Sequence, residues 1–153
     1  MDMSMDEEKS GGFVVDDALT EAARLFMPFA EFIGLLVGHF ENEEKQIFKI
    51  EYKPMLIGST LVNSIHGGFI GGFMECAAAN FTRAMNKLDY MPRTIDYSID
   101  YLRPGLAEEP MYCECKISKQ GNRIAFVSTQ AWQTDYFKPT AKARANFLME
   151  KPN

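Results

Sequence analysis

The sequence is poor in the residues that bind metals or build disulfide frameworks, with three cysteines and two histidines in 153 residues. An odd number of cysteines indicates reduced thiols rather than a disulfide scaffold. Cys113 and Cys115 are two residues apart, and His39 and His66 lie far from them in the sequence, so the spacing of zinc ligands is missing. We therefore expect no metal ion.

The chain also lacks long apolar runs and an excess of positive charge. No stretch of roughly 18 residues is uncharged and apolar throughout, which argues against a membrane span. The net charge is −5 at pH 7, whereas nucleic-acid-binding domains usually carry a basic surface. Residues 1–90 hold a net −7 and residues 91–153 a net +2, so an anionic ligand would fit the second half better.

The first residues, MDMSMDEEKS, are acidic and polar where an export signal would be basic and then apolar. We therefore expect a cytoplasmic protein. Residues 1–12 are predicted to form a disordered acidic tail. The remaining residues, 13–153, have a length that suits a single domain with one core.

Hydrophobic periodicity predicts the α+β class. A helix is expected from Asp16 or Asp17 to Met27, a strand in QIFKIEYK, a loop over 54–64, and one long apolar helix over 69–87. Four alternating strands follow and are expected to form a meander, over residues 94–102, 111–118, 123–132 and 141–149. This order indicates an antiparallel sheet wrapped around the long helix, whose free edges favour pairing with a second copy. Four strand aromatics are expected in the core: Tyr97, Tyr101, Phe126 and Trp132.

The segment SIHGGFIGGFMECAAAN, residues 64–80, places a histidine and a carboxylate in an apolar helix. Burying Glu75 is costly unless the carboxylate is paired or hydrogen-bonded, and a buried carboxylate suits a general base that works near neutral pH. The alternative is a glutamate that reaches the helix edge or pairs with a lysine.

The glycines after His66 leave main-chain N–H groups exposed at a helix N-terminus, where negative charge is stabilised. A developing oxyanion needs such donors, although His66-Gly67-Gly68 alone also fits a simple capped turn. His66 and Glu75 are nine positions apart, about 2.5 helical turns, so they point to opposite sides. If both act on one substrate, a second subunit must supply one of them.

Three segments in this order resemble a known family: HGGFIGGFME, TIDYSIDYLRPG and SKQGNRIAFVSTQAW. They are similar to the hotdog-fold acyl-CoA thioesterases of the phenylacetate-degradation (PaaI-like) type, over roughly residues 25–150. The resemblance implies the hotdog fold and hydrolysis of an acyl-CoA to the free acid and CoA. It implies no cofactor, because CoA is part of the substrate.

The resemblance also implies residue roles. Glu75 would act as nucleophile or as base for water, and Thr94 would help to hold the attacking water. Gly67 would donate its N–H to the thioester carbonyl oxygen, which His66 would orient or polarise. In the family the acid and the HGG loop come from neighbouring subunits, which implies a homodimer, or a dimer of dimers, with active sites at the interface.

Other positions are candidates for substrate binding. Thr60 and Asn63 stand where relatives often carry Asn and Gly, and each can still hydrogen-bond near the substrate, as can the Gly68 backbone. Three cations of the second half are candidates for the CoA phosphates or are solvated surface charges: Arg103, Lys119 and Arg123.

Two further functions remain open at this point. The first is a protein that binds acyl-CoA without cleaving it, because Thr60 replaces the usual Asn. The second is a hydratase or dehydratase acting on acyl thioesters, since hotdog proteins also perform that chemistry with a histidine and an acid.

Overall fold

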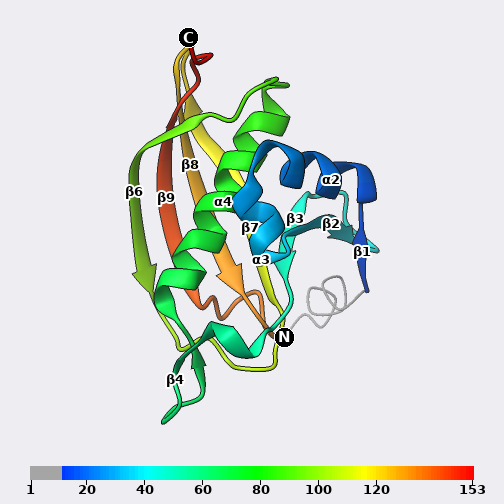
Figure 1. The fold of residues 1–153 in the computed structure, drawn as a ribbon, viewed down its shortest axis with the longest axis vertical. Coiled ribbons are helices and arrows are strands. Elements are labelled where there is room, and N and C mark those ends of the chain that lie inside the picture. The colour runs from blue at the N-terminus through cyan, green and yellow to red at the C-terminus, as the bar shows by residue number, and fades with distance from the viewer. Residues whose placement is uncertain (1–11) are drawn as a thin grey trace, which may run out of the picture.

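A seven-stranded antiparallel sheet wraps around one long helix, α4 (Gly67–Met85), in the computed structural model (Figure 1). The structure describes residues 12–153, so the predicted acidic tail lies, apart from Gly12, outside the described residues. In sheet order the strands are β1 (Phe13–Val15), β2 (Leu36–Phe40), β3 (Ile47–Ile50), β7 (Met111–Gln120), β8 (Ile124–Trp132), β9 (Ala141–Leu148) and β6 (Arg93–Tyr101). The predicted α+β class and the sheet around one long helix are confirmed.

The predicted meander is wrong for its first strand. β6 lies at the edge of the sheet beside β9, while β7 pairs with β3. Alternation of apolar and polar residues shows which face of a strand is buried but not which strand lies beside it. The sequence prediction also missed β1 and β2. The segment expected to be a loop holds a 3₁₀ turn (Pro54–Leu56), followed by a small hairpin of β4 (Ile57–Ser59) and β5 (Ser64–Ile65).

Two shorter helices lie between β1 and β2 in the chain and cover one side of α4 (Figure 1). The first, α2 (Asp17–Phe26), begins as predicted, because the Asp16 carboxylate accepts a hydrogen bond from the Leu19 N–H at 2.9 Å. The second, α3 (Pro28–Ile33), starts at the proline that ends α2 and stops at Gly34, whose φ of 71° suits glycine. None of the described helices is long and apolar enough to cross a membrane.

The core lies between α4 and the inner face of the sheet. Phe73, Met74, Ala77 and Ala78 of α4 are fully buried there. The inner faces of β8 and β9 carry mostly alanines, Ala125, Ala131, Ala141, Ala143 and Ala145. These small side chains let the helix pack close to the sheet.

The aromatic residues expected in the core divide into three environments. Trp132 is buried, but in a second cluster with Phe40 and Ile47, and Tyr97 is half-buried against α4. The prediction is wrong for Tyr101 and Phe126, which are 52% and 38% exposed. Tyr101 ends the edge strand, and Phe126 faces outward because its neighbours in β8 occupy the inner face.

Candidate active site

Glu75 lies in the middle of α4 and accepts a hydrogen bond from the Thr94 hydroxyl of β6, with an oxygen–oxygen distance of 2.9 Å. The carboxylate is half-buried rather than fully buried in the single chain. The structure therefore brings together two residues that the sequence analysis had assigned to the same site from separate segments. An ionised carboxylate held by a hydroxyl group is positioned to act on a bound substrate or water.

A β-bulge in β6 makes this contact possible. Thr94 pairs with Phe147 and Asp96 with Asn146, so Ile95 is an extra residue in the edge strand. Thr94 and Tyr97 are three positions apart and would face opposite sides of a regular strand. The extra residue turns both side chains toward α4.

Two tyrosines of β6 fix α4 against the edge strand. The Tyr97 hydroxyl donates to the Gly71 carbonyl at 2.8 Å, and the Tyr101 hydroxyl donates to the Gly67 carbonyl at 2.7 Å. Burial raises the pKa of Tyr97, so its hydroxyl stays protonated as a donor. The sequence analysis had assigned both tyrosines to packing, because periodicity does not show which partner a tyrosine hydroxyl group bonds to.

His66 caps the N-terminus of α4. Its Nδ1 accepts a hydrogen bond from the Gly68 N–H at 2.9 Å, so in the neutral ring the proton is on Nε2. The His66 N–H donates to the Leu56 carbonyl at 2.7 Å, which ties the histidine to the 3₁₀ turn. The Gly68 amide is therefore used within the loop.

Gly67 is the first residue of α4, and its N–H has no carbonyl four residues earlier within the helix. The amide thus points out of the helix N-terminus, where the dipole favours negative charge. This is the geometry that the proposed oxyanion donor requires.

Glu75 and His66 do not meet within one chain. Nine residues of helix separate them by about 13 Å along the axis and place them on opposite sides. A single substrate can contact both positions only if a second copy of the chain contributes one of them.

Thr60 and Asn63 lie around the tip of the β4–β5 hairpin, which projects beyond the N-terminal end of α4 (Figure 1). Both residues are exposed. Asn63 has a φ of 48°, so it serves as a turn residue, and its carbonyl accepts a hydrogen bond from the Ala107 N–H at 3.3 Å. Within one chain these two residues therefore lie at the His66 end of α4 and not near Glu75.

The structure does not bring the three candidate cations together. Arg103 follows β6 and donates to the Pro139 carbonyl at 2.8 Å, whereas Lys119 and Arg123 lie by the β7–β8 turn at the opposite end of the sheet (Figure 1). Arg123 also forms an ion pair with Glu150. Within one chain the three cations therefore form no single cluster, because the length of β8 separates the loops, and their role as CoA ligands stays a prediction.

Three comparisons relate the chain to known proteins. Residues 63–136 match the family model described as Thioesterase superfamily. The medium/long-chain acyl-CoA thioesterase YigI of Escherichia coli K12 is 27% identical over 133 residues, covering 76% of this chain and 84% of YigI. A solved protein from Chromobacterium violaceum is 33% identical with a TM-score of 0.67, covering 89% of this chain and 96% of that one.

A further solved structure is similar in fold. The PaaI protein of the E. coli phenylacetic acid degradation operon is 18% identical with a TM-score of 0.71, covering 89% of this chain and 94% of that one. The region that matches the family model contains the HGG loop, Glu75 and Thr94.

Proposed function

Because this chain belongs to the thioesterase superfamily, we propose that it hydrolyses an acyl-CoA thioester to the free acid and CoA, with Glu75 as the essential acid. The family match makes the chain a hotdog-fold thioesterase, as the sequence resemblance implied. The name of the YigI relative supports a medium- or long-chain acyl group as substrate. The observation that carries the role of Glu75 is its hydrogen bond to Thr94.

The reaction needs an attacking oxygen and a site for the negative charge on the carbonyl oxygen. Glu75 either removes a proton from the attacking water and passes it to the leaving CoA thiolate, or attacks the thioester carbon itself to form a mixed anhydride that water then hydrolyses to the free acid. Thr94 holds the carboxylate and the water in place. The Gly67 N–H and the protonated Nε2 of His66 stabilise the oxyanion until the CoA thiolate leaves. No cofactor takes part, since CoA belongs to the substrate.

The proposed site is completed by a second copy of the chain. β6 presents a nine-residue edge with no neighbour among the described residues on its outer side, and most of its residues are exposed. An unprotected edge of this length favours pairing with another strand. Pairing of two β6 edges in a symmetric dimer would bring the HGG loop of one copy toward Glu75 of the other.

The direct test replaces Glu75 with Gln, which preserves the size of the side chain and removes its charge. We expect kcat for a medium- or long-chain acyl-CoA to fall about 100-fold or more, measured by release of free thiol. Glu108→Gln, in an exposed loop, is the matched control and should retain activity. Equal rates for Glu75→Gln and the parent would refute the proposed role of Glu75. Tight acyl-CoA binding by the parent without thiol release would favour the binding protein instead.

A further inference from the structure

Arg83 is a buried cation without a counterion. The residue is 9% exposed, and its Nε is buried and has no hydrogen-bond partner. No ion pair found among residues 12–153 includes it. Burial also lowers the pKa of the guanidinium, which is the expected effect of desolvation on a charge without compensation.

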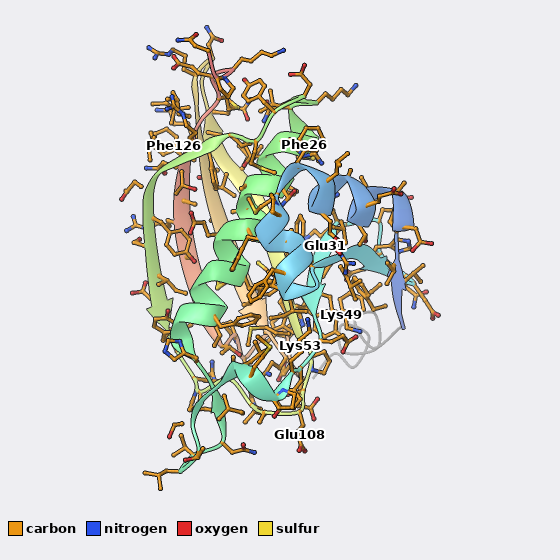
Figure 2. All side chains as sticks on the ribbon, viewed as in Figure 1. Phe26, Glu31, Lys49, Lys53, Glu108 and Phe126 are labelled. Atoms are coloured by element: carbon orange, nitrogen blue, oxygen red, sulfur yellow. The ribbon has the colours of Figure 1, made fainter. Side chains whose placement is uncertain are left out.

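The guanidinium lies on the ring of Phe26, the last residue of α2, with 4.5 Å between the guanidinium carbon and the ring centroid. Figure 2 labels Phe26 beside the upper turns of α4. The ring holds one face of the planar group. No hydrogen bond found among residues 12–153 uses the N–H donors of this group, which leaves their hydrogen-bonding capacity to an anion.

Arg83 and Glu75 are the charged residues of α4. Eight positions separate them, which corresponds to about 12 Å along the helix and about 80° around it. The two side chains therefore leave the same half of the helix, Glu75 toward the edge strand β6 and Arg83 toward α2. Helical side chains lean toward the N-terminus, so the long arginine side chain shortens the distance to Glu75.

Packing alone does not explain a guanidinium at this position. A neutral side chain such as methionine would fill the space between α2 and α4 without the cost of removing a charge from water. An arginine fixed against an aromatic ring suits a carboxylate or a phosphate, because its fork of donors binds two oxygens at once.

We propose that Arg83 binds an anionic group of the thioester substrate, either a carboxylate at the far end of the acyl group or a phosphate of CoA. This inference rests on the proposed function of the Glu75 site. Arg83 would be a specificity-determining residue, since it contacts a part of the substrate distant from the reacting carbonyl.

The test compares Arg83→Gln with the parent on four substrates: a methyl-ended acyl-CoA, its ω-carboxyl analogue of equal length, and the pantetheine thioesters of both acyl groups, which lack the nucleotide phosphates. We expect kcat/KM to fall about 10- to 100-fold for substrates that carry the recognised anion and to change less than about twofold for the others. A loss confined to the ω-carboxyl pair identifies the acyl carboxylate. A loss confined to the two CoA esters identifies the phosphates.

Equal losses on all four substrates, or no loss on any, would overturn the proposal. Equal losses accompanied by a change in oligomeric state would assign Arg83 to the subunit interface instead. Arg144→Gln, on the exposed outer face of β9, is the control for removing an arginine. Thermal unfolding should show Arg83→Gln to be folded, because it leaves no buried charge without a partner.

A binding experiment separates this inference from the proposed function. CoA and the ω-carboxyl acyl-CoA are titrated into Glu75→Gln and into the Glu75→Gln, Arg83→Gln double variant. Weaker binding by the double variant supports the role of Arg83 even if the parent hydrolyses no thioester in the panel. Equal binding of both ligands by the two proteins contradicts it.

Discussion

Thr94 positions Glu75 through the hydrogen bond that its hydroxyl group donates to the carboxylate. A hydrogen bond to a charged group contributes about 1.5–3 kcal/mol. We therefore expect Thr94→Val to lower kcat about tenfold, with a smaller effect on KM, because the carboxylate loses its orientation and not its charge. Thr94→Ser, which keeps the hydroxyl, should retain most of the activity. Equal kcat values for the Val and Ser variants would show that the contact does not assist the reaction.

Cys76 gives a prediction for stability at alkaline pH. Burial raises the pKa of its thiol from 9.0 to about 12. Above pH 9 the unfolded chain releases a proton that the folded chain keeps, so the unfolded state binds fewer protons. The free energy of unfolding should then decrease as the pH rises from 9 toward 12, by at most about 1.4 kcal/mol per pH unit for this group.

Urea denaturation on either side of pH 9 measures this effect. Cys76→Ala removes the thiol and should make the decrease shallower than in the parent. The buried Cys115, whose pKa is also raised by burial, contributes in the same direction and remains in both proteins. Identical pH slopes for Cys76→Ala and the parent would contradict the assignment to Cys76.

Sequence reasoning found some of these residues and missed others for identifiable reasons. Glu75 was evident because a carboxylate in an apolar helix needs a special environment. Thr94 came from the family resemblance, and its contact depends on the bulge at Ile95, which alternation does not reveal. Arg83 was missed because an arginine near the C-terminal end of a helix is ordinary until its burial is known.

The N-terminus of α4 supplies a test at the level of the secondary-structure element. Proline is well tolerated at the first position of a helix, and the extended φ and ψ of His66 (−61° and 129°) suit a residue before proline. Gly67→Pro should therefore fold, and it removes the amide proton proposed to stabilise the oxyanion. We expect kcat to fall about 100- to 1000-fold, measured with the acyl-CoA that the parent hydrolyses.

Gly67→Ala is the matched control. An added Cβ at this position meets the Tyr101 ring at 3.3 Å in either variant, but alanine keeps the N–H. Gly67→Ala should consequently be much more active than Gly67→Pro. Equal activities would show that crowding, and not the amide, is responsible.

The structure places the boundaries of α4 two residues earlier than the sequence analysis, at 67–85 rather than 69–87. The helix starts at Gly67 because the His66 side chain caps it. Glycine has low helix propensity, so the pattern alone placed the start after Gly68. The cap is a local contact between residues two positions apart, and the sequence analysis offered it only as the alternative to an oxyanion site.

At the scale of the whole molecule, the proposed sharing of an active site between two copies of the chain predicts complementation between inactive variants. In a mixed dimer of Glu75→Gln and Gly67→Pro, one site combines the intact Glu75 of the Gly67→Pro chain with the intact Gly67 of the Glu75→Gln chain. The other site carries both substitutions and is inactive. When the variants are mixed in equal amounts and allowed to exchange subunits, about a quarter of the parent activity should return, because half of the dimers are mixed and each has one working site.

Thiol release from the mixture, compared with each variant alone, measures the recovery. The control mixes Glu75→Gln with Thr94→Val. Glu75 and Thr94 are contributed to a site by the same chain, so this mixture should restore less activity. No recovery after confirmed subunit exchange would show that Glu75 and the Gly67 amide act within one chain, or not together.

The sheet order was the part of the fold that sequence patterns did not determine. Strand positions followed from alternation, but β6 and β7 are neighbours in the chain and lie on different sides of the β8–β9 pair. The position of each strand in the sheet depends on how the strands cover α4. Alanines of β8 and β9 face this helix, while the tyrosines of β6 reach it from the edge of the sheet.

The pairing of β3 with β7 has a consequence for how the chain is made. Ile47 finds its partner Glu114 only after α4 and β6 have been synthesised. The apolar surfaces of β2, β3 and α4 therefore leave the ribosome before the strands that bury them. Contacts so distant in sequence slow folding and prolong the exposure of such surfaces, so nascent chains that stop before β9 should recruit chaperones and aggregate.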